Sequence, residues 1–410
     1  MLSNAERALK ITLLWACAMS FCGLPALAQA APLAYVVNRQ DSNVSVVDVA
    51  RNSLVSTIPA GMASPHRITI SQDGRRAYLS SIWSTTITVL DLDRRSLLTR
   101  ISLNATSNDV ALHPHRPLAY ADTNTPAGAM IAVIDTSTHE VLRSFPSGAQ
   151  KTQGIALSPD GERLYSLEPQ NDLGSARVTV IDPLSSAVLA HISVAAEPAA
   201  IKVHPSGGFV YVLHAGSHDS HGSVTVIDTR THTVSASVSV GRSPTDMAFH
   251  PAGTQAYVIN QGDNTVAVMD TRKHSIAAWI ALGSAAQQVA FNPRGTHAYV
   301  SNQEGNTMSI IDTLTQQLLE TVPVGGSPWG IAVADNAPSP ALRIASVQAE
   351  HASPSGAADT AASQQALLTP GSSKRSGVVQ SVPVSGVWAG LLLVVSGIAA
   401  LHHLGRKLQG

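Results

Sequence analysis

A motif of one tyrosine followed by one aspartate recurs seven times along this chain, with a period of 42 to 46 residues. All seven tyrosines of the sequence occupy one position of the repeat: Tyr35, Tyr78, Tyr120, Tyr165, Tyr211, Tyr257 and Tyr299. Each is followed by an apolar segment that ends in aspartate: Asp48, Asp91, Asp135, Asp182, Asp228, Asp270 and Asp312. A repeat of this length, built from four short strand-like segments, is typical of a β-propeller blade.

One unit, residues 244–283, shows how the strands are predicted. The segments DMAF, AYVIN, TVAVMDT and SIAAWIAL are short and rich in apolar or β-branched residues, and turns containing Gly, Pro or Asn separate them. Segments of this length, interrupted in this way, favour strands over helices. The aspartate that ends the third strand has a short side chain, which we expect to accept backbone N–H groups of the next turn.

The order of the segments predicts how the propeller closes. Seven first strands are visible, but the repeat region begins with a second strand, LAYVVN, and ends with a lone first strand at 330–334. Pairing of these two segments removes the open sheet edges. We therefore predict an all-β fold for residues 31–335. It is a seven-bladed propeller of four-stranded antiparallel blades, closed by its C-terminal strand.

The two ends of the chain have a different composition. Residues 1–30 combine a basic start, an apolar run and the small residues ALAQA, as in a secretory signal peptide. Both cysteines lie in this segment, so the mature chain would have no disulfide and no covalent c-type haem. Residues 336–380 read as a disordered Ala/Ser/Pro-rich linker. Residues 381–410 read as a transmembrane anchor or a sorting tail, because 18 apolar residues precede a basic end.

The marks AYVVN, AYVIN and AYVSN, followed by VSVVD, VAVMD and MSIID, resemble those of the YVTN β-propeller repeat family. The resemblance covers all seven units and implies a secreted or envelope-bound propeller. It supplies no catalytic residues. The segment SVPVSGVWAGLLLVVSG, followed by LGRK, is similar to bacterial envelope-sorting tails. We accordingly expect an extracytoplasmic protein, in the periplasm or at the cell surface, that is held at the membrane by its C-terminus.

The loops indicate which face binds a ligand. The Tyr-to-Asp spacing is 13 in four units but 15, 17 and 17 in the third, fourth and fifth, so their second-to-third loops are enlarged. Loops of this kind share a face with the residues that precede each first strand, where the central channel opens. The predicted channel mouth comprises His66, Arg67, Asn108, Asp109, Gln153, Asp246, Gln287, Gln288 and Trp329. This set fits either a solvated entrance or a site for a small anionic or amphipathic ligand.

The enlarged loop of the fifth unit, HAGSHDSHG, suggests a metal site. His214, His218, Asp219 and His221 lie within eight positions, and imidazole and carboxylate groups are ligands for Zn²⁺ or Cu²⁺. The alternative is a solvated polar loop. No other cofactor is expected.

The net charge of −1 shows no excess of basic residues, so nucleic-acid binding is not indicated. The sequence also has no GxSxG, HExxH or phosphate-loop motif. We therefore expect a non-catalytic envelope propeller that binds a small ligand or an envelope protein on its loop face. The alternative is a lactonase-type hydrolase that uses the channel-mouth residues.

Overall fold

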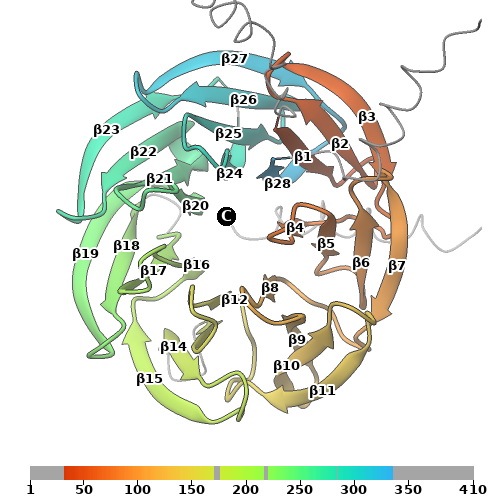
Figure 1. Cartoon of the computed structure of the whole chain (residues 1–410). Coiled ribbons are helices and arrows are strands. Elements are labelled where there is room, and N and C mark those ends of the chain that lie inside the picture. Colours follow the sequence, from red (N-terminus) through yellow and green to blue (C-terminus); the bar gives the residue numbers. More distant parts are fainter. Residues whose placement is uncertain (1–31, 170–175, 217–219, 284, 336–410) are drawn as a thin grey trace, which may run out of the picture. The chain divides into compact units, whose positions relative to one another are not determined.

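The computed structural model describes residues 32–169, 176–216, 220–283 and 285–335. All of them belong to one compact unit, residues 1–351, and a second unit, residues 352–410, lies outside them. Within the described residues, seven four-stranded antiparallel sheets are arranged as blades around a central axis (Figure 1). The predicted all-β, seven-bladed propeller is confirmed.

The first strand of each blade lies innermost (Figure 1). The first strands are β4 (Arg67–Ile70), β8 (Val110–Leu112), β12 (Gly154–Leu157), β16 (Pro198–Val203), β20 (Pro244–Phe249), β24 (Ala286–Phe291) and β28 (Pro328–Ala334). The second strands are β1 (Leu33–Asn38), β5 (Arg76–Ser80), β9 (Leu118–Thr125), β13 (Leu164–Glu168), β17 (Phe209–His214), β21 (Gln255–Asn260) and β25 (His297–Asn302).

The third strands are β2 (Asn43–Asp48), β6 (Thr86–Asp91), β10 (Gly128–Asp135), β14 (Ala176–Ile181), β18 (His221–Asp228), β22 (Thr265–Asp270) and β26 (Thr307–Asp312). The outermost strands are β3 (Ser53–Pro59), β7 (Ser96–Ser102), β11 (Val141–Pro146), β15 (Val188–Val194), β19 (Thr233–Arg242), β23 (Ser275–Ala281) and β27 (Gln317–Pro323). A 3-10 turn, η1 (Gln261–Asp263), joins β21 to β22. We number the blades 1 to 7 by their second strands in chain order.

Blade 1 is closed by the last strand, as predicted. Its sheet has the order β28-β1-β2-β3, and β28 pairs antiparallel with β1 so that Leu33 lies opposite Ala334. Strands from the two ends of the repeat region therefore share one blade, and no first blade is left with an exposed inner edge.

The recurring residues have the roles that the repeat predicts. All seven tyrosines are buried in second strands, between neighbouring blades. Each aspartate of the motif accepts at least one backbone N–H from the turn that follows, as Asp228 does from Arg230 and Thr231 at 2.8 and 3.2 Å. The burial of the tyrosines and the capping of the turns explain why these two positions repeat so strictly.

Three histidines form a second type of contact between blades, which we call the histidine latch. His204, in the turn after β16, donates a 2.7 Å hydrogen bond from Nε2 to the carbonyl oxygen of Gly253 in the next blade. His250 makes the same bond to Gly295 at 3.0 Å, and the ring of His113 packs on Gly161. Because Nδ1 of His204 accepts the backbone N–H of Ser206, the carbonyl contact fixes Nε2 as the donor.

No helix among the described residues is long and apolar enough to cross a membrane. The predicted signal peptide, linker and membrane segment all lie outside the described residues.

Candidate functional site at the channel mouth

A cavity of about 530 Å³ opens where the first strands begin, at the mouth of the central channel. The structure brings together seven of the nine residues predicted there: His66, Arg67, Asn108, Gln153, Gln287, Gln288 and Trp329. Residues at the ends of second strands complete the lining, among them Ile82, Asn124 and Ala215. Both sets of loops assigned to the binding face thus contribute to one cavity.

Asp109 and Asp246, the other two predicted residues, do not line the cavity, but their negative charges raise the pKa of Arg67. An Oδ2 atom of Asp109 lies 3.8 Å from Nη1 of Arg67, whose side chain is only 12% exposed. Burial by itself lowers the pKa of Arg67, but the carboxylates of Asp109, Asp246 and Asp122 outweigh it and raise that pKa. The guanidinium is therefore a permanent cation held inside the mouth.

His66 is the second titratable residue in the lining, and it is uncharged. Burial, together with the positive charges of Arg67 and Arg39, lowers the pKa of His66 to about 3. The ring centroids of His66 and Trp329 lie 4.7 Å apart, and the guanidinium carbon of Arg39 lies 4.4 Å from the centroid of the Trp329 ring. At neutral pH, Arg67 is therefore the single formally charged residue among the described lining residues.

Three buried polar atoms of these residues have no hydrogen-bond partner among the described residues. They are Nε of Arg67, Nδ1 of His66 and Oε1 of Gln287. Buried polar groups are nearly always hydrogen-bonded, because an unmade bond costs about 1–3 kcal/mol. All three atoms belong to residues that line one cavity, but each atom itself is buried beneath the cavity surface.

Asp122 is a residue of this region that the site prediction missed. It is fully buried, and its Oδ1 accepts the backbone N–H groups of Asn108 and Asp109 at 2.9 and 2.7 Å. Burial raises the pKa of Asp122 to about 6, although these bonds and the hydroxyl of Thr152 oppose the shift. The carboxylate fixes the segment that carries Asn108. The sequence held a sign of it, since AYADTN departs from the repeat at this residue.

The enlarged loop of blade 3 is shorter than predicted, because its extra residues lengthen the strands. β9 and β10 have eight residues each and pair up to Gly128 opposite Thr125, so a tight hairpin replaces the expected loop. Parts of the other two enlarged loops, residues 170–175 and 217–219, lie outside the described residues.

The predicted metal ligands are described in part. His214 is buried; its Nδ1 lies 3.1 Å from the carbonyl of Ala196, and its Nε2 lies 2.9 Å from the hydroxyl of Thr225. Burial lowers its pKa. His221 is exposed at the start of β18, while His218 and Asp219 lie outside the described residues. The described part of the chain holds no group of three metal-binding side chains, so the metal site stays a prediction.

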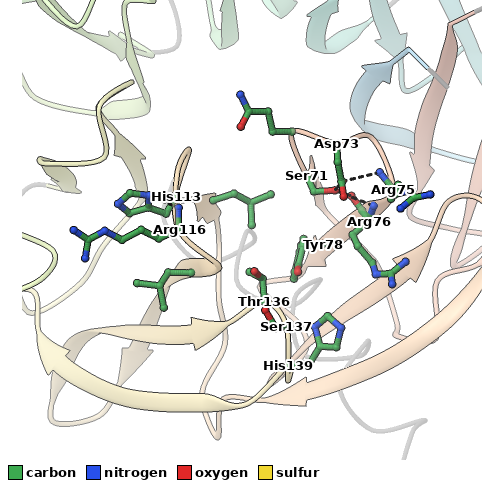
Figure 2. Close-up of a pocket in the computed structure, with 13 residues that line it drawn as sticks. Ser71, Asp73, Arg75, Arg76, Tyr78, His113, Arg116, Thr136, Ser137 and His139 are labelled. Atoms are coloured by element: carbon green, nitrogen blue, oxygen red, sulfur yellow. Dashed lines mark hydrogen bonds between the residues drawn. The ribbon is translucent and has the colours of Figure 1, made fainter. Parts of the chain in front are cut away.

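A second cavity, of about 670 Å³, lies at the far ends of blades 2 and 3, away from the mouth. It contains three arginines, but Figure 2 shows Arg116 extending away from Arg75 and Arg76. Arg75 contacts Asp93 at 3.3 Å, and Arg76 contacts Asp91 at 3.2 Å. The three guanidinium groups therefore do not converge on one anion.

The fold and the mouth define a seven-bladed β-propeller with a polar cavity at one end of its channel. Residues 170–277 match the family model "Lactonase, 7-bladed beta-propeller". A stretch of 160 residues is 29% identical to the seven-bladed beta-propeller protein Rv1057 of Mycobacterium tuberculosis. This stretch is 39% of the chain and 40% of Rv1057, so the chain matches less than half of the length of that relative.

Solved structures resemble the chain in fold. A chain of hydrazine synthase from Kuenenia stuttgartiensis superposes with a TM-score of 0.63 at 20% identity, covering 68% of this chain and 92% of that one. A functionally unknown protein from Desulfotomaculum acetoxidans gives 0.62 at 16% identity, over 74% and 98% of the two chains. Dihydro-heme d1 dehydrogenase NirN gives 0.54 at 16% identity, over 73% and 74%. At these identities the likeness concerns the fold alone.

Proposed function

We propose that the protein binds a small, singly charged anionic ligand at the channel mouth and catalyses no reaction on it. The observation that carries the proposal is the permanent cation of Arg67 in the lining of a cavity whose other described lining residues are uncharged. A carboxylate would accept from the guanidinium of Arg67, where partial burial strengthens a charge-assisted bond. Trp329 and Ile82 offer apolar contact beside it.

The chemistry of His66 favours binding over catalysis. A general base works best when its pKa lies near the working pH. With a pKa of about 3, His66 takes up a proton poorly at neutral pH, and its ring serves as a neutral hydrogen-bonding group. Asp109 and Asp246 do not line the cavity, and their carboxylates help to raise the pKa of Arg67.

The experiment is a calorimetric titration with a panel of small carboxylates and their uncharged amides. We expect at least one acid to bind while its amide does not, and Arg67→Gln to abolish the binding. Arg67→Lys, which keeps a buried charge, controls for misfolding. Arg230→Gln changes an exposed arginine in the turn between β18 and β19 and should have no effect. Equal binding of acids and amides would refute the proposal.

Lactone hydrolysis is the alternative, and the family match over residues 170–277 favours it. Turnover of a lactone panel by the wild-type protein, abolished in His66→Ala, would establish the enzyme and overturn the binding proposal.

We also propose that the protein is extracytoplasmic, belongs to the YVTN repeat proteins and is held at the membrane by residues 381–410. The apolar character of residues 384–401, the basic residues that follow them and the signal-like N-terminus support this placement. On this view an envelope protein is the second class of partner that the loop face would meet.

A further inference from the structure

Side-chain carboxamides dominate the lining of the mouth cavity. Six of them come from four blades: Asn108, Asn124, Gln153, Gln261, Gln287 and Gln288. Asn124 is used within the protein, since its Oδ1 accepts the N–H of Thr152 at 2.8 Å and its Nδ2 donates to the Thr152 carbonyl at 3.1 Å. It braces the wall, and the other five amides differ from it in their bonding.

Those five amides retain hydrogen-bonding capacity. Asn108 donates to the carbonyl of Gln153, and Gln287 donates to Oε1 of Gln303 at 2.7 Å. Their amide oxygens have no partner among the described residues, and neither do the side-chain amides of Gln153, Gln261 and Gln288. The cavity therefore presents several acceptors and several N–H donors around one cation, Arg67.

A ligand that matches this set must carry many groups that both donate and accept, together with one negative charge. A carboxamide offers a donor and an acceptor side by side, and a hydroxyl has the same dual capacity. We propose that the mouth binds a monosaccharide-sized sugar acid, with its carboxylate on Arg67 and its hydroxyls on the carboxamides. This inference rests on the proposed function and specifies its ligand. The cavity volume of about 530 Å³ suits a ligand of that size.

Blade 5 provides the space for the sugar ring. It contributes only small apolar residues to the lining, Ala199 and Ala215, whereas blades 3, 4, 6 and 7 contribute the amides. Ala199→Tyr keeps every polar group of the site but fills this side of the cavity. The variant therefore tests where the ligand lies without removing a hydrogen bond.

The test is a calorimetric titration of the full chain with glucuronate, galacturonate and gluconate. Glucose, which lacks the carboxylate, and cyclohexanecarboxylate, which lacks the hydroxyls, are the matched probes. We expect at least one sugar acid to bind at least about tenfold more tightly than either probe, because an unmatched hydrogen-bonding group is rejected strongly. Ala199→Tyr and Gln288→Leu should each weaken the sugar acid about tenfold or more, whereas Arg230→Gln should not.

The outcomes separate this inference from the proposal beneath it. If cyclohexanecarboxylate binds as well as every sugar acid, the sugar-acid inference fails while anion binding at the mouth stands. If the sugar acid binds but Gln288→Leu leaves its affinity unchanged and Ala199→Tyr does not block it, the inference fails as well. If no carboxylate of either panel binds, the inference and the proposed function both fail.

Discussion

Substituting Gly253 by alanine should lower the free energy of unfolding by about 2–3 kcal/mol, because it breaks a histidine latch. Gly253 has a φ of +70°, which costs an alanine about 1–2 kcal/mol. The new Cβ would lie 2.9 Å from Cε1 of His204. The ring of His204 cannot move without losing its 2.7 Å bond to the Gly253 carbonyl, and that loss adds about 1 kcal/mol.

The chain supplies a matched control in the preceding blade. Gly207 has a φ of +74°, but a Cβ there would meet nothing closer than Cδ of Pro159 at 3.6 Å. Gly207→Ala should therefore show only the conformational cost, and the difference between the two glycines measures the latch. In a His204→Ala background the clash is gone, so Gly253→Ala should cost no more than Gly207→Ala.

The assay is denaturant unfolding of the wild type, the single variants and the double variant, compared as a double-mutant cycle. We expect a coupling of about 1 kcal/mol between positions 204 and 253. Equal costs for Gly253→Ala and Gly207→Ala, with no coupling to His204, would refute the latch.

Three further predictions concern the mouth, the closure and the anchor. Asp122→Asn should flatten the pH dependence of stability between pH 4 and 6. In the folded wild type the pKa of Asp122 is about 6, above the ordinary 3.8, so its free energy of unfolding falls by up to about 3 kcal/mol as the pH rises through this window. Unfolding curves at pH 4 and 6.5 check this, and parallel losses in both proteins would contradict it. Gly330→Ala places a Cβ 2.8 Å from the His66 carbonyl and should destabilise the closed blade by about 1–3 kcal/mol. Gly283→Ala is the control, because its Cβ would meet nothing within 4 Å and should not change stability. Equal melting temperatures for the two variants would contradict this prediction. Full-length protein should partition with membranes, and a chain ending at Gln380 should be released. Recovery of intact full-length protein in the soluble fraction would contradict the anchor.

The sequence was sufficient for the architecture because its repeat is physical. A buried tyrosine and a turn-capping aspartate recur once per blade, so their positions count the blades and set the phase of the strands. The lone first strand at residues 330–334 was sufficient to predict closure, since an unpaired inner strand has one free partner.

The details of the mouth were less predictable. The repeat places residues before each first strand, which located Arg67 and Trp329, but it does not show which side chains face the cavity and which support it from behind. Asp109 and Asp246 occupy positions equivalent to those of lining residues, yet neither lines the cavity: Asp109 lies 3.8 Å from Arg67, and Asp246 lies 3.5 Å from Nζ of Lys202. The histidine latches were missed for a similar reason. The sequence around His204 (HPSG, 204–207) and His250 (HPAG, 250–253) is that of a turn, and only the fold shows that the next blade places a glycine carbonyl against each ring.

The pairing of β28 with β1 also fixes where the chain enters and leaves the propeller. Leu33 lies opposite Ala334 at the end of the blade away from the mouth, and a Cβ on Gly74, in the turn after β4, would lie 3.4 Å from the carbonyl oxygen of Asp335. Both ends of this domain therefore lie on the face of the propeller opposite the mouth. A fusion tag or a surface-coupling group at residue 335 should leave the cavity accessible, and joining residues 33 and 334 by a short linker would permit new termini in any outer turn.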